Sequence, residues 1–68
     1  MIYPHFMRVV NTNDTKFLLW NTGNYQYRIE IFDRKNMKML TAINYSKPYE
    51  YVSEIFDDLT KPKLRGSA

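Results

Sequence analysis

Side chains that could carry out catalysis are few and widely separated in this 68-residue chain. The single histidine, His5, follows Pro4 near the amino terminus, where an isolated imidazole is more typical of a surface group than of a general base. Ser46 and Ser53 have no histidine nearby in the sequence that would activate either hydroxyl as a nucleophile. We therefore expect no catalytic residues and a protein that is not an enzyme.

Metal and cofactor sites are not expected either. The chain has no cysteine, and the adjacent Asp57 and Asp58 would point about 100° apart on a helix, with no third ligand at a suitable spacing. Its two glycines, Gly23 and Gly66, are too few and too far apart for a phosphate-binding loop or a dinucleotide-binding turn. The sequence predicts a protein without a bound metal or cofactor.

Basic and aromatic residues in the first two thirds of the chain point instead to nucleic-acid binding. Residues 1–47 contain seven Lys or Arg against three Asp or Glu, whereas residues 48–60 contain four acids and no base. Cations neutralise phosphates, and flat rings stack on unpaired bases. The residues that we expect to contact DNA or RNA are Arg28, Arg34, Lys35, Lys38, Tyr25 and Tyr27. The alternative is that these cations form an ordinary solvated face and that the tyrosines pack in the core.

The acidic segment supports a competing hypothesis, in which the chain binds a protein. On a helix, four acids would lie on neighbouring turns and could dock on a basic groove: Glu50, Glu54, Asp57 and Asp58. The small size and the Asn, Lys, Tyr and Ile content suggest a bacteriophage or mobile element, so the chain would be an inhibitor or adaptor of a host protein. The alternative is the charged outer face of an ordinary amphipathic helix.

Four segments have the pattern of β-strands. Residues 6–10 and 16–22 are largely apolar and end in turn-forming residues, and Gly23-Asn24 signals a hairpin. Residues 25–33 alternate, with apolar side chains at odd positions up to Ile31 and polar ones at even positions up to Glu30. Residues 37–45 resume after a polar break. This pattern predicts an antiparallel β-meander in which 16–22 is the most buried strand.

From residue 49 onward the apolar spacing becomes that of a helix. One stripe contains Tyr49, Val52, Ile55, Phe56 and Leu59. Ser46 or Lys47 would cap this helix, Pro48 suits its first turn, and Lys61-Pro62 would end it. Since the stripe and one face of the sheet can bury each other, we predict a single two-layer α+β domain, ββββα, over residues 1–60. Residues 61–68 are expected to form a flexible basic tail.

The remaining large apolar residues bear on self-association. Trp20 lies in the most apolar predicted strand, so we expect it in the core. If the sheet face opposite the helix is uncovered, Phe17, Leu19 and Phe32 would form an exposed apolar patch of the kind that marks a binding surface. A chain this short has little core to stabilise it, and a homodimer would cover the patch. We therefore expect a homodimer.

Cellular location is predicted from absences. The lack of cysteine fits a reducing compartment. No apolar run has the length of a signal peptide or of a membrane-spanning helix. We expect a cytoplasmic protein that does not contact a membrane.

Overall fold

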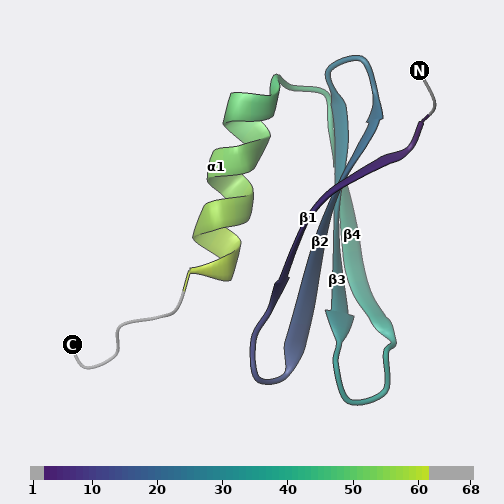
Figure 1. Ribbon diagram of the computed structural model, residues 1–68, viewed down its shortest axis with the longest axis vertical. Helices are drawn as coiled ribbons and strands as arrows, with labels where there is room; N and C mark the ends of the chain where they lie inside the picture. Colours follow the sequence, from purple (N-terminus) through teal and green to yellow (C-terminus); the bar gives the residue numbers. More distant parts are fainter. Residues whose placement is uncertain (1–2, 62–68) are drawn as a thin grey trace.

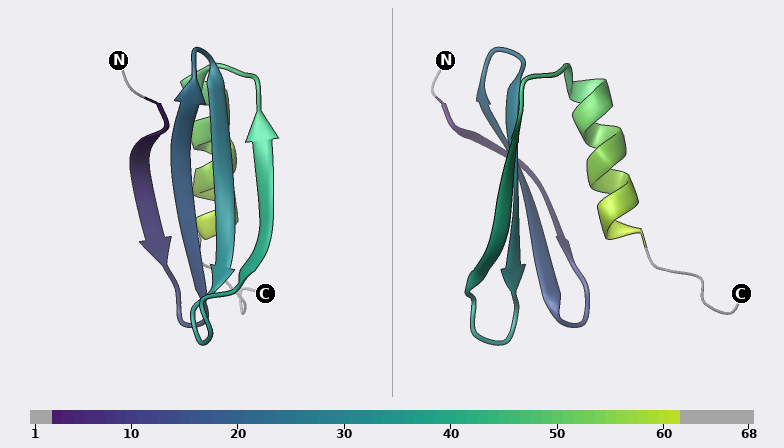
Figure 2. Two further views of the ribbon diagram at one scale, coloured as in Figure 1. Left: turned by 90° about the vertical axis from the view of Figure 1, so that its right-hand side faces the viewer. Right: turned by 180° about the vertical axis from the view of Figure 1, so that it is seen from behind.

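The computed structural model describes residues 3–61, which form one antiparallel sheet and one helix. The elements are β1 (His5–Asn11), β2 (Thr15–Gly23), β3 (Gln26–Asp33), β4 (Met39–Tyr45) and α1 (Tyr49–Thr60). The strands are hydrogen-bonded in the order β1-β2-β3-β4, and α1 packs on one face of the sheet (Figure 1; Figure 2, left). The predicted α+β fold, ββββα, is confirmed. Of the predicted tail, all but Lys61 lies outside the described residues.

The core lies between α1 and the two central strands. It consists of Leu19, Tyr27, Ile29, Val52 and Phe56. Leu19 pairs with Ile29 across β2 and β3, so their side chains share the face that α1 covers. The helix stripe is confirmed over most of its length, whereas Leu59 at its end is 41% exposed. None of the helices in residues 3–61 has the length and apolar character needed to span a membrane.

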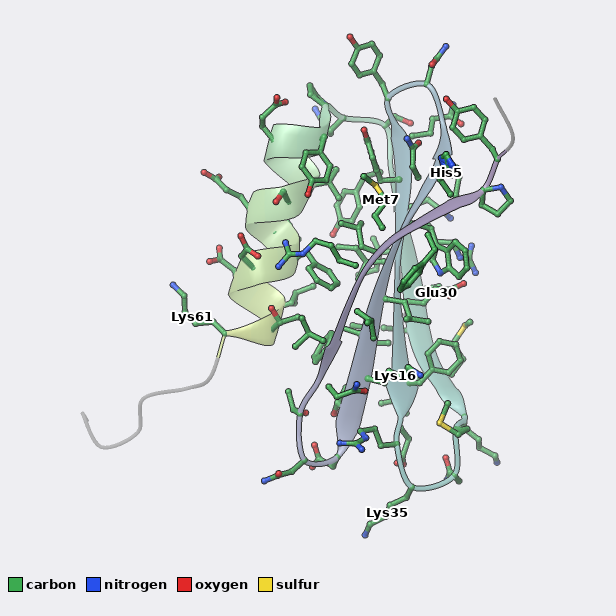
Figure 3. The ribbon with its side chains drawn as sticks, viewed as in Figure 1. His5, Met7, Lys16, Glu30, Lys35 and Lys61 are labelled. Carbon is green, nitrogen blue, oxygen red and sulfur yellow. The ribbon has the colours of Figure 1, made fainter. Side chains whose placement is uncertain are left out.

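A side chain from the edge strand β1 reaches across the sheet to α1. A bulge between Phe6 and Arg8 leaves Met7 without a partner on β2, and Met7 points toward the helix (Figure 3). The Arg8 guanidinium lies 4.8 Å from the ring centroid of Phe56, and its Nη1 donates to Asp57 Oδ1 at 2.8 Å. Because the Arg8 and Asp57 side chains are 35% and 55% exposed to solvent, we assign this ion pair no more than about 1 kcal/mol. One carboxylate of the acidic helix face is therefore bound to the sheet rather than directed away from it.

The start of α1 differs from the prediction. Pro48 is the N-cap residue, with an extended backbone and no side-chain capping bond, and its carbonyl accepts from the N–H groups of Tyr51 and Val52. Ser46 lies two residues before the cap and Lys47 one residue before it, so neither occupies the position from which a side chain caps the first turn. The predicted cap at Ser46 or Lys47 is wrong, whereas the predicted end of the helix before Pro62 agrees with Lys61 as C-cap.

The turn between β2 and β3 is shifted by one residue from the predicted Gly23-Asn24. Gly23 pairs with Gln26, which leaves Asn24 and Tyr25 as the turn residues. Tyr25 has a φ of 53°, in the left-handed region that a non-glycine residue seldom adopts. Its side chain is therefore not on the face of β3 that carries Tyr27, and it is 70% exposed at the tip of the turn.

Burial of Tyr27 predicts a loss of stability at alkaline pH. Burial, reinforced by the charge of Glu50, raises the pKa of the Tyr27 phenol above its ordinary value of 10.0. The folded state thus holds the phenolic proton more tightly than the unfolded state, and this contribution is lost as the pH rises through the folded-state pKa. We expect the urea midpoint of the native protein to fall more steeply above roughly pH 10 than that of Tyr27→Phe. Parallel curves for the two proteins from neutral to alkaline pH would contradict the assignment.

Candidate nucleic-acid interface

The sheet face opposite α1 is uncovered by any described residue, and we call it the open face (Figure 1). Strand alternation and pairing place the following side chains on it: Phe6, Val9, Asn11, Lys16, Leu18, Trp20, Thr22, Gln26, Arg28, Glu30, Phe32, Met39, Ala42 and Asn44. Lys16 and Glu30 can be followed in Figure 3, where they lie on the side of the sheet away from the helix. Most of the uncharged positions are apolar or aromatic, an unusual composition for a sheet face in contact with solvent.

Trp20 anchors one end of the open face. Its indole Nε1 donates to Glu30 Oε1 at 2.8 Å, and Arg28 Nε donates to Glu30 Oε2 at 2.9 Å. Phe6 packs edge-on against the indole, with ring centroids 5.3 Å apart and an interplanar angle of 67°. The predicted core position of Trp20 is wrong because β2 is apolar on both faces, and the helix covers the face that carries Leu19. These bonds fix the orientation of the indole and place a cation against the Glu30 carboxylate.

Phe32 provides a second aromatic position on the open face. It pairs with Lys16 on β2 and is followed across the sheet by Met39, which is 46% exposed. Lys16 and Trp20 are four positions apart along β2, so the two aromatic positions lie roughly 13 Å apart along the strands. The charged groups of the open face are Lys16, Arg28 and Glu30, which leaves it with a net charge of +1.

Further cations lie at the end of the sheet nearest Phe32, in the β3–β4 connection 34–38, which we call the basic hairpin. Two side chains stabilise the turns of this hairpin by binding backbone N–H groups. Asp33 Oδ1 accepts from the Lys35 N–H at 2.9 Å, and Asn36 Oδ1 accepts from the Lys38 N–H at 3.0 Å. Arg34 is engaged elsewhere, since its Nη1 donates to the Thr12 carbonyl at 2.6 Å. Lys35 and Lys38 remain exposed at the tip, where Figure 3 shows Lys35 extending away from the sheet.

The nucleic-acid residues predicted from sequence are only partly brought together. Arg34, Lys35 and Lys38 share the basic hairpin, whereas Arg28 lies in the middle of β3 and is bound to Glu30. Tyr25 is exposed at the opposite end of β3, in the β2–β3 turn. Tyr27 is 7% exposed beneath Tyr49, with ring centroids 5.9 Å apart, so its ring faces the core and is not open to a base.

The predicted apolar patch also changes composition. Phe17 shares the covered face with Leu19 and packs against the core, and Leu19 itself is fully buried. Of the three predicted members only Phe32 lies on the open face. Sequence reasoning did not select Phe6, Lys16 and Trp20, although the alternation of β3 already assigns Arg28 and Glu30 to the uncovered side, and pairing with β2 would have placed Trp20 beside them.

The acidic residues of the alternative protein-binding hypothesis lie on α1, whereas Phe17 and Phe32 lie on opposite faces of the sheet. Glu50, Glu54 and Asp58 are exposed, while Asp57 is held by Arg8. Within residues 3–61, no cluster of three or more His, Cys, Asp or Glu side chains could hold a metal ion. A separate groove lies between the β1–β2 loop and the end of α1, lined mainly by residues 10–15 and 59–61.

Comparisons with known proteins add no functional assignment. No protein-family model, no curated protein and no solved structure matches the chain.

Proposed function

We propose that this protein is a non-catalytic module that binds single-stranded nucleic acid on its open face. The observation that carries the proposal is the placement of Phe6, Trp20 and Phe32 on three neighbouring strands of the face that α1 leaves uncovered. Unpaired bases stack on aromatic rings without regard to sequence, and each such contact contributes about 1–3 kcal/mol. Two aromatic positions roughly 13 Å apart would engage separate nucleotides of one strand.

Electrostatics support the same surface. The cations nearest Phe32 are Lys16 on the open face and Lys35 and Lys38 on the basic hairpin, and all three are available to phosphates running past that end of the sheet. The Glu30 carboxylate would repel a phosphate, but Arg28 and the Trp20 indole already bind it. Cations and rings on one surface meet the two requirements of a single strand, which exposes a charged backbone and stacking bases together.

Trp20 is the only tryptophan in the chain and gives a direct assay. We expect an oligothymidylate of about 12 nucleotides to quench Trp20 emission on binding, because a base stacks beside the indole. Contacts to about three phosphates would make log K fall with log salt concentration with a slope of roughly −2. Duplex DNA of the same length, whose bases are already stacked and paired, should quench less.

Charge reversal at two lysines tests whether nucleic acid binds the open face or is attracted only by the net positive charge of the protein. Lys16→Glu places a carboxylate on the open face beside Phe32 and should weaken binding at least about tenfold and flatten the salt slope. Lys61→Glu makes the same change in net charge at the end of α1, on the other layer of the molecule (Figure 3), and should have a small effect. Absence of quenching even at low salt, or equal effects of the two variants, would overturn the proposal.

A further inference from the structure

The edge strand β4 offers unpaired backbone groups at the side of the sheet. The backbone of Asp33 is bonded toward the β4 side, since its N–H donates to the Lys38 carbonyl at 2.9 Å and its carbonyl accepts from the Met37 N–H at 2.7 Å. Along β3 the backbone groups of every second residue point to the same side, so those of Ile31 and Ile29 also point to β4. The backbone groups of their partners, Thr41 and Ile43, point back to β3. The N–H and C=O groups of the residues between and beyond these partners, Ala42 and Asn44, therefore face outward at the free edge.

This edge lacks the features that prevent strands from pairing between molecules. The seven residues of β4 include no charge and no proline, and its one irregularity lies near its start, between the partners of Ile31 and Phe32. The other edge, β1, is interrupted by the Met7 bulge and carries Arg8. Apolar side chains of β4 are exposed on the sheet, with Leu40 at 60% and Ile43 at 37%. Of the two edge strands, β4 is therefore the one suited to pair with a strand of another molecule.

We propose that the β4 edges of two copies of this chain pair antiparallel, making a two-fold symmetric dimer with one continuous eight-stranded sheet. A second copy is the occupant that β4 itself favours, because this strand carries no charge and two identical edges can approach without a like-charge pair, although each chain has a net charge of +3. The helix does not block a second copy from reaching β4. The sheet residues of the core beneath α1 belong to β2 and β3, and Ile43 on β4 is exposed. A chain this short gains stability from such association.

The regular part of β4 fixes the register. Centring the pair on Ile43 places Ala42 opposite Asn44 of the second copy, so that the outward-facing groups exchange roughly four hydrogen bonds. Ile43 then meets Ile43 of the second copy as a non-hydrogen-bonded pair on the helix side, an arrangement in which β-branched side chains pack well. The two-fold axis is perpendicular to the sheet, so both open faces lie on the same side of the dimer. The dimer does not depend on the proposed function, and either can fail alone.

Cysteine cross-linking tests the register directly, because the native chain contains no cysteine. Ile43→Cys should form an intermolecular disulfide on mild oxidation, since facing Cα atoms of a non-hydrogen-bonded pair lie about 4.5 Å apart, within the range that a disulfide spans. Thr41→Cys is the matched control on the same face of the same strand. In this register residue 41 faces Tyr45 of the second copy and lies roughly 13 Å along the strand from residue 41 of that copy. The Thr41→Cys protein should therefore run as a monomer on a non-reducing gel.

Light scattering during gel filtration tests the dimer itself. We expect a mass of twice the 8.2 kDa of one chain, and a mass of one chain for Ala42→Pro. Proline removes an outward N–H that β3 does not use, so circular dichroism should be retained; if this variant does not fold, Ala42→Lys places a charge at the same edge. A monomeric native protein, a dimer that survives folded Ala42 variants, or equal cross-linking of Ile43→Cys and Thr41→Cys would overturn the proposal.

Discussion

Replacement of Phe56 by alanine is expected to remove a large share of the free energy of unfolding. The ring is fully buried between α1 and the sheet, and the Arg8 guanidinium lies over it at 4.8 Å. Truncation of a buried phenylalanine costs about 3–5 kcal/mol, through lost burial and the cavity left behind. A chain of this length has a total stability of only roughly 3–10 kcal/mol, so the substitution removes a large share of it. Urea denaturation followed by far-ultraviolet circular dichroism measures the loss.

Leu59→Ala is the control for this prediction, because Leu59 lies on the same helix and is 41% exposed. We expect this second truncation to cost about 1 kcal/mol or less. Phe56→Leu retains most of the buried volume and should fall between the two. If Phe56→Ala and Leu59→Ala had the same urea midpoint, the helix would not be packed on the sheet through Phe56.

The order of the elements follows from sequence because each periodicity is distinct. Residues 25–33 alternate with a period of two, and the structure has β3 at Gln26–Asp33. From Tyr49 the apolar residues follow the period of a helix, and α1 runs from Tyr49 to Thr60. A helix with one apolar stripe and a sheet with one apolar face have few ways to bury each other, so the two-layer arrangement follows once both elements are recognised.

The composition of the open face was harder to predict because it depends on strand register. Residues 16–22 are apolar at odd and even positions alike, so the sequence does not mark which face the helix covers. A shift of one residue moves every side chain of a strand to the opposite face, and the left-handed conformation of Tyr25 makes such a shift in the β2–β3 turn. The sequence pattern therefore predicts Trp20 in the core and Phe17 in the exposed patch, and the register places them the other way round.

The bulges had no sequence signal that pattern reasoning could use. Met7 is an extra residue in β1, and it changes which neighbours face the helix: Phe6 pairs with Trp20 on the open face, while Arg8 reaches Asp57 on the other. Strict alternation from Phe6 would have put Arg8 on the same side as Phe6. The contact of β1 with α1 is thus a tertiary feature, visible only after the strands are paired.

Truncation of the open-face aromatics is expected to have the largest effect on nucleic-acid binding. If bases stack on this surface, Phe6→Ala and Phe32→Ala should each weaken oligothymidylate binding by roughly 5- to 160-fold, the equivalent of about 1–3 kcal/mol per base. Phe6 is 51% exposed, so its truncation should leave the fold intact. The two rings lie roughly 13 Å apart along the strands, beyond the distance at which substitutions normally influence each other. Anisotropy of a labelled oligonucleotide measures the affinities at fixed salt.

Additivity decides whether both rings hold the same strand. When one oligonucleotide spans both positions, the fold-losses of the single variants should multiply in the double variant Phe6→Ala/Phe32→Ala. A dinucleotide, which is too short to span roughly 13 Å, should be sensitive to one substitution at most. Tyr51→Ala, which removes a half-exposed ring from α1 on the other layer, should bind as the native protein does. Native affinity in the double variant would exclude stacking on Phe6 and Phe32, and binding that remained salt-dependent would then rest on the cations Lys16, Lys35 and Lys38.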